Sequence, residues 1–215
     1  MLWMCNVKRT VWSSQSGIVP SRDSRWTKRA VVCVVGTLVL LSEVSTGQPV
    51  QAKESAYQFS LSGKVVNVAD GDTFTLRVSD GTRRVRMASI DAPETGKGRN
   101  QPGQPFGQAS RRALADMIAG KTITVHCYEQ DRYERAICDV PLSQNDTANQ
   151  RMVAQGMAWA NTEKRGQFLR DPRLPAVQEG ARAQGVGLWS EPDPVAPWQW
   201  RYTCWRQKQC AGQGD

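Results

Sequence analysis

Histidine is almost absent from the 215-residue chain, which contains only His126, and the six cysteines form no Cys-x-x-Cys pair. A structural zinc site needs four clustered cysteine or histidine ligands, so this scarcity argues against a zinc protein. The sequence also lacks an internal repeat, and its apolar run from Ala30 to Leu41 is too short to span a bilayer comfortably. What remains is a chain of ordinary hydrophobic content, long enough for one domain with appendages.

The first 52 residues are typical of an N-terminal extension followed by a signal peptide. Four basic residues between positions 22 and 29 precede the apolar run, and Val50 to Ala52 supplies small or apolar residues before a cleavage point. The part ahead of the basic residues is long for a signal peptide, so either the start codon lies downstream, near Val19, or this part stays as an anchor. We expect cleavage, export to the periplasm or the medium, and no stable membrane association afterwards.

Export decides how the cysteines are interpreted, because disulfides persist in oxidising compartments. Cleavage would leave Cys127, Cys138, Cys204 and Cys210, an even number that indicates two disulfides. Four cysteines allow three pairings. We favour Cys127–Cys138 across a hairpin and Cys204–Cys210 around a short C-terminal loop.

Charge and composition divide the chain into three parts. Half of the formal net charge of +8 lies in residues 1–52, so the rest carries a moderate positive charge that permits nucleic-acid binding without proving it. We expect the folded domain over residues 53–190. Residues 191–215 form a tail that is rich in tryptophan, proline and cysteine.

The apolar patterns predict three strands, a helix, two strands and then two helices. The first two strands lie in a β-rich stretch, Tyr57 to Val78, which Gly63 and an Asp-Gly-Asp turn interrupt. The other elements are expected at residues 83–90, 106–120, 121–127, 135–140, 147–156 and 174–185. This order predicts an α+β fold, a closed five-stranded β-barrel of the OB type with three helices packed outside it.

Four carboxylates fall at turns of the predicted barrel strands. Asp70 and Asp72 flank the glycine in "VADGDTFTL", and Asp91 and Glu94 follow the third strand in "IDAPET". Each pair alone is explained by ordinary turn chemistry. Neighbouring strands lie about 5 Å apart, however, so their ends can share one pocket, where four acids repel one another unless cations lie among them.

Two arginines can supply part of that positive charge. Arg86 precedes Asp91 on the third strand, and Arg135 follows "DRY" in the second hairpin. Phosphodiester cleavage needs acids that hold Ca²⁺ or Mg²⁺ beside arginines that bind the phosphate, and this set of residues fits that need. The alternative interpretation of the same residues is a surface salt-bridge network. Side chains alternate along a strand, so Arg86 and Asp91 can meet only across a bulge or a strand end.

The linked motifs "VADGDTF", "RVRMASIDAPE", "FGQAS", "DRYER" and "RMVAQGMAWA" resemble the staphylococcal nuclease (thermonuclease) family. The closing "GLWSEPDPVAPWQWR" looks like that of exported bacterial members, and the resemblance spans roughly Tyr57 to Arg201. It implies an OB-type barrel with three helices and a nuclease that uses Ca²⁺ to cleave DNA and RNA. The products would carry a 3′-phosphate and a 5′-hydroxyl, with single strands favoured as substrate and a monomeric enzyme.

The resemblance also assigns roles to individual positions. It places the metal between Asp72, Asp91 and the Ala92 carbonyl, with Asp70 at the rim. It makes Glu94 the general base, and it assigns binding of the scissile phosphate to Arg86 and Arg135 and of a terminal phosphate to Arg132 and Tyr133.

The chain departs from the family pattern at two places near this site. Glu134 stands where a glycine is usual, which strains the turn if its φ is positive. The polar run "NTEKRG" replaces a tyrosine that stacks on bases or contacts phosphate. These departures keep a second hypothesis open, an OB-type module that binds nucleic acid with weakened catalysis. A third, a Ca²⁺-stabilised domain without a nucleic-acid role, does not explain Arg86 and Arg135.

Overall fold

The computed structural model describes residues 57–210, so the predicted extension and signal peptide, and the last five residues of the tail, lie outside it. Five strands close into a barrel in the order β1-β2-β3-β6-β5. β1 pairs antiparallel with β2 and β5, and the parallel pairing of β3 with β6 closes the barrel. The strands are β1 Phe59–Asp70, β2 Thr73–Val78, β3 Gly81–Met87, β5 Thr122–Gln130 and β6 Ala136–Asp139. The predicted five-stranded barrel is therefore confirmed.

Gly63 does not interrupt the first strand, contrary to the prediction. It lies inside β1 and pairs with Ile123 of β5. A Cβ at this position would collide with the backbone carbonyl of Arg77 in β2. The glycine therefore allows neighbouring backbones to approach closely where the barrel curves, which is a second common use of glycine in strands.

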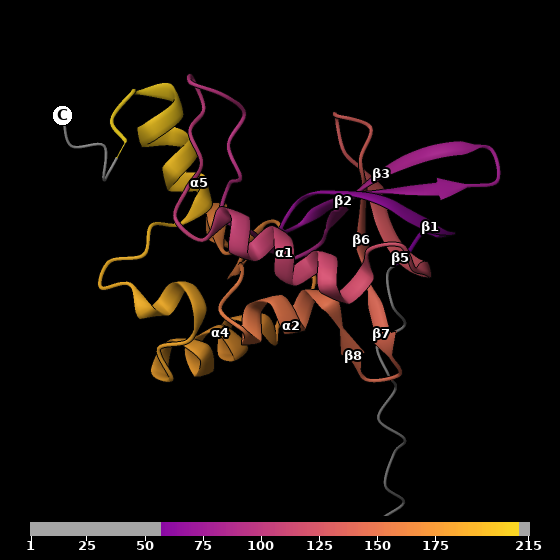
Figure 1. Ribbon diagram of the computed structural model, residues 1–215. Coiled ribbons are helices and arrows are strands. Elements are labelled where there is room, and N and C mark those ends of the chain that lie inside the picture. Colours follow the sequence, from indigo (N-terminus) through magenta and orange to yellow (C-terminus); the bar gives the residue numbers. More distant parts are fainter. Residues whose placement is uncertain (1–56, 211–215) are drawn as a thin grey trace, which may run out of the picture. The chain divides into compact units, whose positions relative to one another are not determined.

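Three longer helices lie outside the barrel, as predicted, together with several short helical turns (Figure 1). The longer helices are α1 Gly107–Ile118, α2 Ala148–Ala154 and α4 Leu174–Ala183. The short ones are α3 Glu163–Gly166, the 3₁₀ turn η1 Gly187–Ser190, α5 Pro197–Trp200 and the π-helical turn η2 Arg201–Arg206. None of the described helices is long and apolar enough to cross a membrane.

The core lies inside the barrel and under α1 and α2. It is built from inward-facing strand residues together with one face of each helix, and fully buried members include Phe74, Leu76, Val85, Leu114, Ile118, Val125 and Met152. A second apolar cluster lies beneath the C-terminal part of the described chain. There Trp159 packs against Trp189 and Trp198, with ring centroids 4.5 and 5.9 Å apart. These tryptophans thus serve packing.

Four strands of two or three residues complete the connections outside the barrel. β4 Ile90–Asp91 pairs with β9 Trp159–Ala160, and β7 Pro141–Ser143 pairs with β8 Asp146–Thr147. The β4–β9 pair ties the segment after β3 to the segment after α2. It thereby fixes the chain that carries Asp91.

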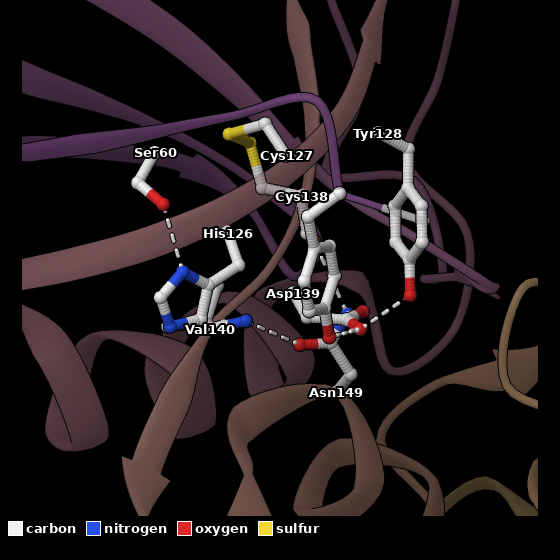
Figure 2. The surroundings of a disulfide bond; sticks show 9 residues. Ser60, His126, Cys127, Tyr128, Cys138, Asp139, Val140 and Asn149 are labelled. Carbon is white, nitrogen blue, oxygen red and sulfur yellow. Dashed lines mark hydrogen bonds between the residues drawn. A yellow bond between two sulfur atoms is a disulfide. The ribbon is translucent and has the colours of Figure 1, made fainter. Parts of the chain in front are cut away.

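Both favoured disulfides are present. Cys127–Cys138 joins the neighbouring strands β5 and β6 and is fully buried, and Cys204–Cys210 closes the last turn. Figure 2 shows the surroundings of the first bond. There Tyr128 donates a hydrogen bond to the Asp139 carboxylate at 2.8 Å. The disulfide therefore lies within a cross-linked region of β5 and β6.

Candidate active site

The Asp-Gly-Asp turn lies between β1 and β2, directly beneath α1. Gly71 is buried, and a Cβ there would collide with the Ser110 side chain of α1, so only glycine fits. Asp72 is 3% exposed, and its carboxylate accepts hydrogen bonds at 2.8 Å from the Thr73 hydroxyl and from the backbone N–H of Ala92. The turn is thus fixed to the segment that carries the other two acids.

Arg86 and Asp91 meet because β3 ends between them. β3 stops at Met87, Ser89 has a left-handed φ of 66°, and β4 starts at Ile90, which confirms the strand end that the sequence interpretation required. The Arg86 guanidinium lies 2.8 Å from Asp72 Oδ2 and 2.9 Å from Asp91 Oδ1. One arginine therefore joins two of the predicted metal ligands.

Glu94 lies under the start of α1 and is 8% exposed. The backbone N–H of Gln104 donates to the Glu94 carbonyl at 2.8 Å. Gly107 approaches the same carbonyl so closely that a Cβ would collide with it. The backbone of this residue is therefore held by the loop before α1 and by the helix itself.

The acid cluster, defined as Asp70, Asp72, Asp91 and Glu94, has more negative charge than its arginines neutralise. Burial, together with repulsion from Asp72 and Glu94, raises the pKa of Asp70 to about 8. Burial also raises the pKa of Glu94, although a hydrogen bond from an arginine opposes this shift. Burial alone would also raise the pKa of Asp91. The positive charges and hydrogen bonds of Arg86 and a second arginine outweigh burial, however, and lower the pKa of Asp91. Asp91 is therefore the best-compensated acid of the four.

That second arginine is Arg201, which the sequence interpretation missed. Its guanidinium lies 2.7 Å from Asp91 Oδ2 and 2.7 Å from Glu94 Oε1. Arg201 is the first residue of η2, far from both acids in the sequence. Its only sequence signal is its place after "PWQW", whose buried Trp200 anchors the turn in the fold.

Arg135 lies on the β5–β6 hairpin and bonds to Asp131 of the same hairpin, at 2.6 Å, rather than to the acid cluster. Burial opposes the charge of Asp131, but hydrogen bonds from Arg135 outweigh it and lower the pKa of the carboxyl.

The turn of this hairpin contains the departure at Glu134. Glu134 has a φ of 61°, so the positive φ that makes a non-glycine residue strained is present. Tyr133 at the tip is 58% exposed, with the Arg132 guanidinium 4.8 Å from its ring centroid.

A groove of about 1180 Å³ gathers most of the predicted site residues. Asp70, Asp72, Arg86, Glu94, Arg132, Tyr133 and Arg135 all line it. Asp91 is fully buried and lies below the lining, as does Ala92. Phe168 follows the run "NTEKRG", which lacks the expected tyrosine, and its side chain, 38% exposed, forms part of the groove wall. The Lys164 Nζ lies 5.5 Å from the centroid of the Phe168 ring. The structure thus brings the predicted set to one place.

The donor chemistry of the acid cluster fits a hard divalent cation. Within residues 57–210 no three acidic, histidine or cysteine side chains form a ready-made metal site. The carboxylates are nevertheless the oxygen donors that Ca²⁺ and Mg²⁺ prefer. Burial and, to a smaller extent, the neighbouring carboxylates raise the pKa of Asp70 to about 8, and a cation bound beside it would favour the ionised form instead.

The described residues thus form a small closed barrel whose groove places Asp70, Asp72 and Glu94 beside Arg86 and Arg135, an arrangement that suits cleavage of phosphodiesters. Residues 84–191 match the family described as "Staphylococcal nuclease homologue". The chain belongs to the staphylococcal nuclease family, and it is a nuclease.

Relatives with nuclease names support this membership over most of their own length. An "Uncharacterized endonuclease" of Escherichia coli O157:H7 is 41% identical over 140 residues, which is 65% of this chain and 84% of that protein. One of Haemophilus influenzae is 40% identical over 64% of this chain and 71% of its own. A "Micrococcal nuclease" of Shigella flexneri is 39% identical over 65% of this chain and 79% of its own.

Proposed function

We propose that the chain is a Ca²⁺-dependent nuclease that hydrolyses DNA and RNA with little sequence preference and leaves 3′-phosphate ends. The observation that carries the proposal is the Arg86 guanidinium, which bridges Asp72 and Asp91 in a groove that Glu94 also lines. Little preference is expected because contacts to phosphate carry no base information.

The metal would be held by Asp72, Asp91 and the Ala92 carbonyl, with Asp70 at the rim. Asp72 and Asp91 are already oriented by hydrogen bonds, so part of the ordering cost of binding is met by the fold. When bound, Ca²⁺ would polarise the phosphoryl group and stabilise its developing charge.

The side chains of the groove would carry the remaining chemistry. Glu94 takes a proton from a water molecule, whose oxygen then forms a bond to phosphorus. The bond from phosphorus to the 5′-oxygen breaks, and solvent protonates the leaving oxygen, so the products are a 3′-phosphate and a 5′-hydroxyl. Arg86 and Arg135 bind the phosphate oxygens, most strongly as negative charge develops.

The exposed aromatic rings of the groove favour single-stranded substrate. Tyr133 and Phe168 are both partly exposed in its wall, and unpaired bases can stack on such rings whereas paired bases cannot. Arg132, beside Tyr133, would contact a terminal phosphate. We propose that a monomer suffices, since all these residues come from one chain.

We also propose that the enzyme is exported to the periplasm or the medium. The two disulfides among the described residues support this, because such bonds persist mainly in oxidising compartments. The signal-peptide pattern before residue 53 supports it independently. Fractionation of the producing cells would test it, and an enzyme found in the cytoplasm with its N-terminus intact would contradict it.

Cleavage of end-labelled single-stranded DNA and RNA by the full oxidised chain tests the activity. We expect rapid cleavage with Ca²⁺, less with Mg²⁺, none with a chelator, and slower cleavage of duplex DNA. Arg86→Ala and Glu94→Gln should each lower kcat by about 10²-fold or more. Arg86→Lys keeps the charge and serves as a control for folding, with intermediate activity because an ammonium group cannot make the planar two-pronged contact of a guanidinium with a phosphate.

The product ends separate this chemistry from other metal-dependent cleavage. A 3′-phosphate blocks extension by a DNA polymerase until a phosphatase removes it. Products that are extended without phosphatase treatment would contradict the proposed bond cleavage. Salt-sensitive binding without cleavage would instead favour the weakened nucleic-acid-binding module.

A further inference from the structure

The C-terminal segment, defined as Pro197–Arg206, contributes several side chains to the lining of the groove. The indole N–H groups of Trp200 and Trp205 both donate to the Pro102 carbonyl, at 3.3 and 2.9 Å, in the loop before α1. In Figure 1 this loop lies beside α5 and the turn that follows it. The segment is therefore fixed against the same loop that positions Glu94.

Arg201 projects from this segment onto the acid cluster. Its Nη1 lies 3.1 Å from Asp91 Oδ1 and its Nη2 lies 2.7 Å from Asp91 Oδ2, so it binds both oxygens of the carboxylate. The same Nη1 donates to Glu94 Oε1 at 2.7 Å. One guanidinium thus holds the predicted metal ligand and the predicted base together.

Asp91 has little capacity left for another cation in this arrangement. Its carboxylate accepts three hydrogen bonds from two arginines, one from Arg86 and two from Arg201. The side chain is 1% exposed beneath them. A divalent cation that binds Asp91 must therefore replace at least one of the arginine contacts.

Arg201 is the arginine that can leave at lower cost. Its side chain is 32% exposed, against 18% for Arg86. Arg86 also bonds to Asp72, so its departure would leave two buried carboxylates without their partner. Arg201 would instead move toward the open groove, where water can solvate its charge.

We propose that Arg201 is an internal counter-ion that competes with the divalent metal for Asp91, so that the C-terminal segment sets the metal affinity of the site. This inference rests on the proposed metal-dependent function. Arg201 lies beyond residues 84–191, the part that matches the family, so the competition belongs to the C-terminal segment. A purely structural ion pair would leave the metal affinity unchanged when it is removed.

Calorimetric titration of the full oxidised chain with Ca²⁺ alone measures this competition. Arg201→Gln removes the charge but keeps a polar side chain on the same aliphatic stem, and its Kd for Ca²⁺ should be about tenfold lower than that of the wild type. Arg201→Lys keeps the charge without the two-pronged contact and should fall between them. Arg206→Gln removes the same charge from the same segment and should change the Kd less than twofold.

Thermal unfolding gives a readout that does not depend on activity. In a chelator, Arg201→Gln should melt about 5 °C or more below the wild type, because the buried carboxylates of Asp91 and Glu94 lose a positively charged partner. Added Ca²⁺ should raise the Tm of this variant more than that of the wild type. Equal Tm values in the chelator would show that the ion pair is not formed in solution and would overturn the inference.

The two proposals fail in different ways. If the wild type binds Ca²⁺ and cleaves DNA, but Arg201→Gln binds Ca²⁺ no more tightly, only the counter-ion role of Arg201 is overturned. A wild-type chain that binds Ca²⁺ but does not cleave contradicts the proposed function while the Kd comparison still decides the role of Arg201. Absence of Ca²⁺ binding in both chains overturns the inference and removes the metal from the proposed function.

Discussion

Arg135 and Asp131 lie four residues apart on the β5–β6 hairpin, and the arginine donates two hydrogen bonds to one oxygen of the aspartate, from Nε at 2.8 Å and from Nη2 at 2.6 Å. The other oxygen of Asp131 accepts the backbone N–H groups of Tyr133 and Arg135, at 2.9 and 3.0 Å. A single carboxylate therefore closes the turn and orients the arginine along the groove.

Asp131→Asn should separate these two tasks. The amide oxygen can still accept the backbone N–H groups, but the amide nitrogen cannot accept hydrogen bonds from a guanidinium. We expect kcat/KM for single-stranded DNA to fall about tenfold, because Arg135 loses a charge-assisted contact that fixes its direction. Steady-state cleavage assays measure this effect.

Asp131→Ala provides the matched comparison, since it removes both sets of hydrogen bonds. It should lower the Tm as well as kcat/KM, whereas Asp131→Asn should mainly affect kcat/KM. A wild-type kcat/KM in the asparagine variant would show that Arg135 does not depend on Asp131 for its orientation.

The lowered pKa of Asp131 predicts how the free energy of unfolding depends on pH. Burial opposes its charge, but hydrogen bonds from Arg135 outweigh burial and place the pKa of Asp131 below its ordinary 3.8. A lowered pKa in the folded state means that the stabilisation is present above pH 3.8 and is lost as the pH falls through the folded value. The difference in free energy of unfolding between wild type and Asp131→Ala should therefore stay constant from about pH 7 to 5 and shrink below about pH 4. Urea unfolding across this range measures it, and a difference that grows in acid would refute the assignment.

Glu134→Gly should stabilise the hairpin. Glu134 has a φ of 61°, a conformation that glycine adopts without steric cost. We expect the free energy of unfolding to rise by roughly 0.5–1 kcal/mol, net of the extra entropy that glycine gives the unfolded chain. Because the change also removes an acid next to Arg135, kcat/KM should not fall.

Glu179→Gly in α4 is the control for that substitution. Glu179 is an exposed helical residue, so glycine there should lower the free energy of unfolding by about 1 kcal/mol. Opposite signs at the two positions, measured by urea unfolding, would establish that backbone conformation decides the effect. A loss of stability at both positions would mean that the turn tolerates glutamate without strain.

The parts of the site that sequence alone could predict are those governed by local rules. Asp70 and Asp72 were placed correctly because Asp-Gly-Asp fits a turn between two strands, and strand ends in a small barrel converge. The meeting of Arg86 with Asp91 was predicted on the condition that the strand ends between them, and it does. Local turn chemistry and strand alternation therefore fix this half of the site.

The remaining contacts depend on tertiary packing that no local pattern encodes. Arg201 reaches Glu94 across 107 positions of the sequence, and contacts such as those of the Trp200 and Trp205 indoles with the loop before α1 hold its segment there. The pairing of Arg135 with Asp131 is local, but a strand-period pattern does not show whether an arginine turns toward its own hairpin or toward a distant acid. Gly63 was interpreted as a break because close backbone approach cannot be distinguished from a turn by residue type alone.

Such close approach also predicts how Glu94 responds to a change in α1. Gly107 is the first residue of this helix, and an added Cβ would collide with the Glu94 backbone carbonyl. We expect Gly107→Ala to lower the free energy of unfolding by about 1–3 kcal/mol and to lower kcat by displacing Glu94.

Gly180→Ala is the matched control, because Gly180 lies exposed in α4 with no atom near its added Cβ. It should raise the free energy of unfolding by roughly 0.5–1 kcal/mol with kcat unchanged. Urea unfolding and steady-state cleavage of both variants measure these effects, and an unchanged kcat in a folded Gly107→Ala enzyme would show that the position of Glu94 does not depend on its contact with α1.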